Sequence, residues 1–150
     1  MTPKLALSIR QPWAWLIVNG FKDVENRTWP TNFRGPVLIH AGKTMTKAEY
    51  EACVLFIAPI ERVGNWRLPA FDVLKAQCGG IVGQARITGC VTESNSPWFV
   101  GEYGFTLCEA LPLEFEPCKG ALGFFKPNFQ PEGKPGYRRS FIGEPKGVAV

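Results

Sequence analysis

A short apolar segment bracketed by Pro12 and Gly20 constrains the fold of this chain more than any other feature. Proline suits the first turn of a helix because its missing N–H would have no partner there, and glycine suits the exit because it adopts the left-handed conformation. We therefore expect a helix over residues 13–19. Apolar side chains recur at helical spacing along it and predict its buried stripe: Trp13, Leu16 and Ile17.

Polar and charged side chains flank this helix on both sides, and core packing does not explain them. They are Arg10 and Gln11 before the helix, and Lys22, Glu25 and Arg27 after it. In an extended strand over residues 24–29, Glu25 and Arg27 share one face. Glu25 can then orient Lys22 toward a ligand or accept a proton as a general base. The alternative is an ordinary surface ion-pair network without chemistry.

The segment that begins at Gly20 resembles the G-x-K-x-x-E-x-R signature of the ASCH domain, with Lys22, Glu25 and Arg27 at the signature positions. The resemblance covers roughly residues 4–126 and is strengthened by three further segments: residues 7–14, 34–43 and 120–125. It implies a small β-barrel similar to the PUA domain of RNA-modifying proteins. It also implies a link to RNA binding, RNA cleavage or deacylation of modified cytidine, and it does not choose among the three.

One position departs from the deacylating branch of that family. A threonine taken to be the nucleophile stands there in the place that Glu25 holds in this sequence. A carboxylate can also act as nucleophile or base. The departure nevertheless weakens the expectation of an amidohydrolase acting on 4-acetylcytidine.

Strand and helix patterns predict an α+β, mainly β fold, a small PUA-like barrel with two or three decorating helices. Thr46 and Glu49 form a capping box for a helix over residues 47–58, which Pro59 should stop. A second inserted helical piece is expected at residues 69–76. Strands are expected at residues 5–9, 24–29, 36–41, 81–91, 103–108, 113–115 and 121–125, with Gly83 and Gly89 as bulges or barrel corners and Pro112 as a break.

The barrel is expected to occupy residues 1–126 as one domain. Residues 127–150 are rich in proline, glycine and positive charge and predict a C-terminal tail, without which the barrel folds. The basic side chains of this tail either follow a phosphate backbone or belong to a passive terminus.

Composition narrows the classes of protein without choosing a function. The formal charge of +4 permits attraction to polyanions. Five cysteines, with no C-x-x-C pair, argue against a disulfide framework and a zinc site, and indicate core or near-core thiols. No motif implies a metal or a cofactor. No signal peptide and no apolar run of about 18 residues is present, so we expect a soluble, cytoplasmic protein.

Lys43 is a second candidate for chemistry. It follows Gly42 and precedes the expected start of a helix, where a lysine can bind phosphate as a point charge. The alternative is a solvated loop lysine. His40, the only histidine, lies within an apolar run and is interpreted as a structural residue.

The aromatic residues Trp98 and Tyr103 belong to a loop rich in turn formers. Either ring can stack on a nucleobase, and the tyrosine hydroxyl can bind a phosphate oxygen. The alternative is a hydrophobic plug under the loop.

These residues together predict a barrel mouth that receives single-stranded RNA or one exposed nucleotide. The expected RNA-binding side chains are Arg10, Gln11, Trp13, Arg27 and Trp98. If the protein cleaves RNA, the expected reaction is metal-independent, with Lys43 and Lys22 stabilising charge at phosphate while Glu25 or Tyr103 handles the proton. A binding module without turnover and an amidohydrolase acting on a modified nucleoside are the alternatives.

Overall fold

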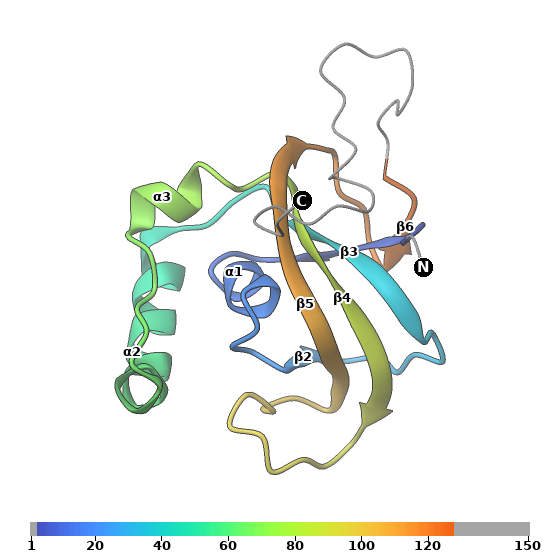
Figure 1. The fold of residues 1–150 in the computed structure, drawn as a ribbon, viewed down its shortest axis with the longest axis horizontal. Coiled ribbons are helices and arrows are strands. Elements are labelled where there is room, and N and C mark those ends of the chain that lie inside the picture. The colour runs from blue at the N-terminus through green and yellow to red at the C-terminus, as the bar shows by residue number, and fades with distance from the viewer. Residues whose placement is uncertain (1–2, 128–150) are drawn as a thin grey trace.

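The computed structural model describes residues 3–127, and a six-stranded sheet is their main feature. The strand order is β2-β5-β4-β3-β1-β6, and the sheet curls into a half-barrel (Figure 1). Only β1 and β3 are parallel; all other neighbours are antiparallel. The strands are β1 (Ala6–Ile9), β2 (Val24–Arg27), β3 (Gly35–Ala41), β4 (Gly80–Val91), β5 (Tyr103–Pro117) and β6 (Phe124–Phe125). The predicted fold class, α+β and mainly β, is confirmed.

Three helices accompany the sheet: α1 (Trp13–Val18), α2 (Lys47–Gly64) and α3 (Phe71–Lys75). Helix α1 agrees with the expectation to within one residue, and Gly20 has the expected left-handed backbone with φ of 83°. It packs against β3, β4 and β5, between the sheet and α2 (Figure 1).

The alternation of apolar residues along the strands explains how the sheet is covered. Leu7, Ile39 and Phe105 belong to the largest buried cluster, together with Ile17 of α1. Their strand neighbours Ala6 and Leu38 belong to a separate cluster, because successive residues of a strand point to opposite faces. A third cluster joins α1 to α2 through Leu16, Cys53 and Ile57 and fixes the second helix against the first.

The expectation that Pro59 ends the second helix is wrong. The capping box at Thr46 and Glu49 begins α2 as expected, but the helix continues through Pro59 to Gly64. A helical proline loses one hydrogen bond, to the carbonyl four residues earlier, which here belongs to Leu55. Both Pro59 and the Leu55 side chain are exposed, so water can reach this side of the helix. Cys53 and Ile57 are buried on the opposite side of the helix, and Ile60, just past the proline, packs on the same cluster as a partly buried side chain.

The expectation that Pro112 separates two strands is also wrong, because β5 is continuous from Tyr103 to Pro117. Pairing with β4 shifts register between Ile81 and Gly83, and Pro112 lies opposite Gly83 at this irregularity. A bulge accommodates a residue that lacks an N–H donor. A side chain at Gly83 would place its Cβ 2.5 Å from the Leu111 carbonyl oxygen, which explains the glycine. The predicted bulges at Gly83 and Gly89 are confirmed.

The remaining differences are at element ends. The last strand is shorter than expected and consists of Phe124–Phe125, and α3 is shorter at both ends than the piece expected at residues 69–76. The predicted tail lies, apart from Pro127, outside the described residues, so its role stays a prediction. Over residues 3–127, no helix combines the length and apolarity needed to cross a membrane.

Candidate functional site

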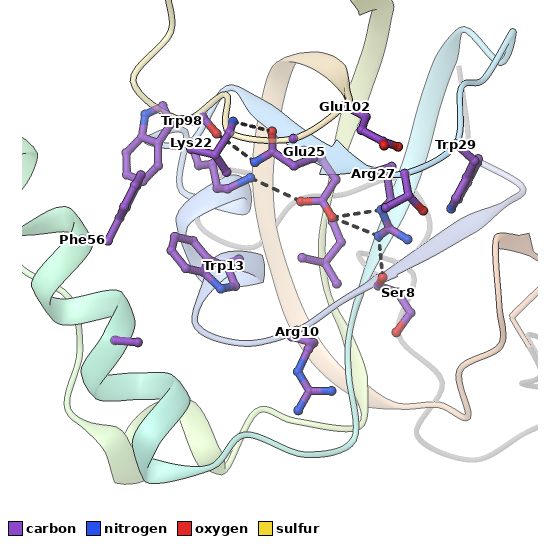
Figure 2. A pocket seen from close by; sticks show the side chains of 16 residues that line it. Ser8, Arg10, Trp13, Lys22, Glu25, Arg27, Trp29, Phe56, Trp98 and Glu102 are labelled. Carbon is purple, nitrogen blue, oxygen red and sulfur yellow. Dashed lines mark hydrogen bonds and ion pairs between the residues drawn. The ribbon is translucent and has the colours of Figure 1, made fainter. Parts of the chain in front are cut away.

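A cavity of about 1160 Å³ opens between β2, the first two helices and the loop that precedes β5. We call it the first cavity and define it by Arg10, Trp13, Lys22, Glu25, Arg27, Phe56 and Trp98, which all line it (Figure 2). The sequence fixes this arrangement locally. Helix α1 ends at the Gly20 turn, and the chain then leads directly into β2, so that the flanking polar residues converge on one place.

The carboxylate of Glu25 lies at the centre of this cavity's polar wall. One of its oxygens is 3.3 Å from Lys22 Nζ, and the other is 3.1 Å from Arg27 Nε and 3.0 Å from an Arg27 terminal nitrogen. Glu25 is only 8% exposed. The prediction that Glu25 and Arg27 share one side of β2 is confirmed, but the network is buried rather than solvated.

Lys22 is the most deeply buried cation of the described residues. It is 5% exposed, donates to the Val24 carbonyl and to Glu25, and lies 5.9 Å above the Trp13 ring. Burial lowers the pKa of Lys22 from its usual value of 10.5, and the neighbouring Glu25 carboxylate opposes this shift. A lysine held in this way has one defined position beside the cavity.

Arg27 connects two strands that are not paired with each other. Its guanidinium binds Glu25 from β2 and also donates to the backbone carbonyl of Ser8 in β1, at 2.8 Å. The planar guanidinium can make these contacts at the same time, which an ammonium cannot reproduce. It also lies 5.7 Å from the centre of the Trp29 ring. The Arg27 side chain therefore links β2 to β1, which share no backbone pairing.

Aromatic rings form the apolar wall of the cavity. Trp13 meets Phe56 edge to face, with centroids 5.8 Å apart, and Phe56 lies 6.1 Å from Trp98. Trp13 is half-buried, so it belongs partly to the cavity and not wholly to the core stripe. Trp98 is 4% exposed and packs on Leu16 and neighbouring core residues, which agrees with the alternative of a plug under its loop.

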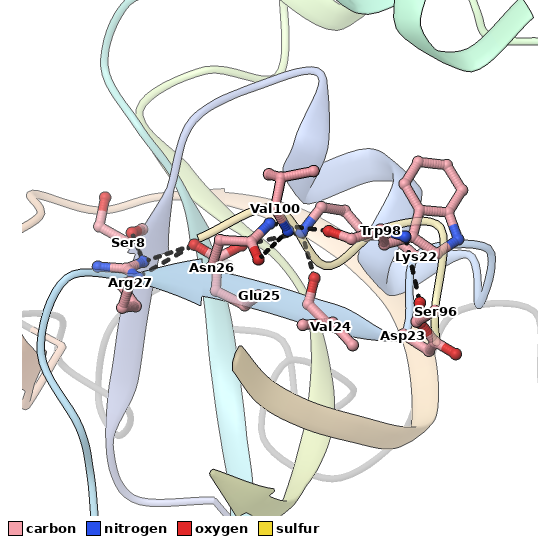
Figure 3. A network of polar contacts seen from close by, with 10 residues as sticks. All are labelled: Ser8, Lys22, Asp23, Val24, Glu25, Asn26, Arg27, Ser96, Trp98 and Val100. Carbon is pink, nitrogen blue, oxygen red and sulfur yellow. Dashed lines mark hydrogen bonds and ion pairs between the residues drawn. The ribbon is translucent and has the colours of Figure 1, made fainter. Parts of the chain in front are cut away.

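Asn26 holds the loop that forms the roof of the cavity, and sequence reasoning did not single it out. Its amide donates to the Trp98 carbonyl at 2.9 Å and accepts from the Val100 N–H at 3.0 Å (Figure 3). Asp23 adds a second tie, because it accepts from the Ser96 hydroxyl at 2.7 Å. The sequence offered one signal for this role, an asparagine between the charged residues Glu25 and Arg27 of β2. Phe56 was also missed, since it lies near no motif, whereas Trp29 follows the signature's Arg27 by two residues.

Arg10 lies at the rim of the first cavity and is exposed. A terminal nitrogen of its guanidinium is 2.7 Å from Glu49 and 3.3 Å from the Thr44 hydroxyl. Glu49 thereby serves both Arg10 and the capping box of α2. The hydrogen bond from Arg10 is the main cause that lowers the pKa of Glu49.

Three predicted site residues lie outside the first cavity. Gln11 is 1% exposed, accepts from the Trp15 N–H and donates to the Gln77 carbonyl, so it holds the backbone. Tyr103 lies opposite Arg27 in the pairing of β5 with β2 and lines neither cavity. Lys43 lines a separate, second cavity of about 700 Å³, together with Ser8, His40 and Lys119.

His40 supports the structural interpretation. It is 2% exposed, and its ring nitrogens are 2.9 Å from the Ser8 hydroxyl and 2.6 Å from the Cys118 carbonyl. A carbonyl only accepts, so Nε2 donates to Cys118, and in the neutral ring Nδ1 then accepts from Ser8. Burial lowers the pKa of His40 from its usual value of 6.5, against the Cys118 hydrogen bond that raises it.

The described residues contain no group of three or more His, Cys, Asp or Glu side chains placed to hold a metal ion. The cysteines within this part of the chain are free thiols. Cys53 is fully buried, and burial raises its pKa to about 12. Cys108 is exposed, contrary to the expectation that all five lie in or near the core.

Comparison with known proteins gives one positive finding. The model of the ASCH domain family matches residues 7–117, which include the whole of the first cavity and most of the sheet. Among curated proteins, nothing matches the chain.

Proposed function

The chain belongs to the ASCH domain family, and from this premise we propose that its first cavity binds one unstacked nucleotide of a single-stranded RNA. RNA binding is the general association of the family. The observation that carries the proposal is the meeting, in one cavity, of aromatic rings with a buried and paired carboxylate. Rings supply stacking surface for a base, and the carboxylate supplies a polar contact for its edge.

The Glu25 network leaves bonding capacity for a ligand. A carboxylate oxygen can accept two hydrogen bonds, and the oxygen bound to Lys22 accepts one within residues 3–127. An ammonium carries three donors, and Lys22 uses two of them, on Val24 and Glu25. An acceptor and a donor therefore lie side by side at the cavity wall. Nucleobase edges present a complementary pair.

The same geometry supports binding more than cleavage. Glu25 already accepts hydrogen bonds from two cations, which weakens it as a general base. Lys43 lies in the second cavity, and Tyr103 lines neither cavity. The groups expected to act together on a phosphodiester are thus apart. Metal-independent cleavage and deacylation of a modified nucleoside stay predictions, and the experiment below includes cleavage as an outcome.

The test is titration of labelled single-stranded RNA and duplex DNA, in EDTA, with both bound and cleaved species followed. We expect tighter binding of the single strand, because stacking on Trp13 needs an unstacked base. The affinity should fall with salt, with a log–log slope of about −0.7 for each phosphate contact. RNA binding that does not depend on salt, or no binding at micromolar protein, contradicts the proposal. Accumulation of cleaved RNA would establish turnover in addition.

A matched pair of variants on one helix tests the role of the cavity. Stacking of a base on an aromatic side chain is worth about 1–3 kcal/mol, so Trp13→Leu should weaken RNA binding by roughly tenfold. Trp15→Leu is the control, because Trp15 lies on the same helix and does not line the cavity. Equal losses in both variants would move the binding site away from the first cavity.

A further inference from the structure

The second cavity adjoins the first one across strand β1. Ser8 lines both cavities. Strand β6 pairs only with Ala6 and Leu7, so the edge of β1 beyond them is not covered by a neighbouring strand in the described structure. The Ser8 carbonyl at this edge instead binds Arg27. The two cavities therefore meet at Ser8.

A backbone contact brings the cationic residues of the two cavities near each other. Gly42 lies against Arg10, and a Cβ at position 42 would be 3.7 Å from the Arg10 Cα. The Gly42 N–H also donates to the Ile9 carbonyl, at 2.9 Å. Arg10 lines the first cavity, and Lys43, which follows Gly42 directly, lines the second. The cations thus continue from one cavity into the next.

The charge of the second cavity is positive and unopposed. Its lining contains Lys43 and Lys119 and no acidic residue. Both lysines are exposed, and neither side chain forms a hydrogen bond or an ion pair within residues 3–127. By contrast, Arg10, Lys22 and Arg27 each have a carboxylate partner. Burial lowers the pKa of His40, which favours the uncharged ring in this lining.

We propose that the second cavity binds the phosphodiester next to the nucleotide held in the first cavity, with Lys43 and Lys119 as its cationic contacts and Ser8 at the crossing. This inference rests on the proposed function and extends the RNA site from one nucleotide to two positions. Lysine binds phosphate as a point charge on a flexible stem, which suits a backbone contact that does not depend on sequence. It also gives Lys43 a role that does not require contact with Glu25.

The test measures the affinity of the full chain for a labelled single-stranded RNA over a range of salt concentrations. Loss of one phosphate contact should make the log–log slope about 0.7 shallower and lower the affinity about tenfold at 50 mM salt. We expect both changes in Lys43→Ala/Lys119→Ala. The matched control is Lys47→Ala, which removes an exposed lysine near Lys43 that lines neither cavity. Its slope should stay close to that of the wild type.

Trp13→Leu distinguishes the base contact in the first cavity from the phosphate contact in the second. This variant should lower affinity without changing the salt slope, because stacking releases no counterions. Should the alanine variant be unstable, Lys43→Gln/Lys119→Gln removes the same charges and keeps the side-chain length. If the wild type binds RNA and the double variant keeps both the slope and the affinity of Lys47→Ala, the inference is wrong while the proposed function stands. If the wild type binds no RNA, both are wrong.

Discussion

The two cavities differ in how their charges are held. In the first, Lys22 and Glu25 are buried and each has partners. In the second, the side chains of Lys43 and Lys119 are exposed and have no partner within residues 3–127. A buried charge needs its partners, because removing one leaves another charge without compensation in a medium that solvates it poorly. An exposed lysine stays hydrated, so its charge needs no partner in the protein. The first cavity therefore couples binding to stability, whereas the second supplies charge that stability does not depend on.

The largest loss of stability is expected from a substitution that breaks the ion-pair network of the first cavity. Glu25→Gln leaves Lys22 and Arg27 without their carboxylate and should lower the free energy of unfolding by about 3–5 kcal/mol. Urea unfolding measures the loss. Glu109→Gln is the control, since its ion pair with Arg86 is exposed, and it should change stability by less than about 1 kcal/mol.

A second substitution sharpens this result. Adding Lys22→Met to Glu25→Gln removes the buried cation and should recover part of the lost stability. Equal losses in Glu25→Gln and Glu109→Gln would mean that the first cavity holds its charges no more tightly than the surface does.

The next effect concerns the closure between β2 and β1. Arg27→Lys keeps a positive charge near Glu25 but cannot also reach the Ser8 carbonyl, and it should cost about 1.5–3 kcal/mol, typical of a hydrogen bond to a charged group. Unfolding and amide hydrogen exchange in β2 are the measurements, with faster exchange expected in the variant. Within residues 3–127 the Arg34 guanidinium bonds only to the nearby Thr31 and Phe33 carbonyls, so Arg34→Lys should exchange like the wild type.

Within the second cavity, His40 is buried whereas the two lysines are exposed. We therefore expect His40 to make the stability of the protein depend on pH. Burial lowers the pKa of His40 in the folded protein below 6.5, so the unfolded chain binds the proton more readily. The free energy of unfolding should therefore fall as the pH falls from about 6.5 toward the folded pKa. Urea unfolding between pH 5 and 7 measures this dependence. In His40→Asn, the free energy of unfolding should depend less on pH over that range. If the dependence is unchanged, groups other than His40 cause it.

The smallest expected effect on stability belongs to Lys43. Lys43→Ala should leave the free energy of unfolding within about 0.5 kcal/mol of the wild type, as expected for an exposed side chain without partners. Thermal unfolding followed by circular dichroism checks this. A loss near that of Glu25→Gln would show that the second cavity is coupled to stability as the first one is.

Local features of the sequence determined much of the fold and part of the site. Pro12 and Gly20 bracket α1, and the capping box at Thr46 begins α2, because caps and turns depend on residues a few positions apart. The alternation along β2 placed Glu25 beside Arg27 for the same reason. Such contacts lie within one turn or one strand, so neighbouring residues suffice to predict them.

Tertiary structure alone decided the rest. Pro59 stays inside α2 because buried contacts on the opposite side of the helix hold it against α1, and Pro112 stays inside β5 because a bulge opposite Gly83 receives it. Lys43 is separated from Glu25 by β1, and Gln11 turns to the distant Gln77 carbonyl. These outcomes depend on packing between segments that are far apart in the chain, and propensity and spacing carry no information about such contacts.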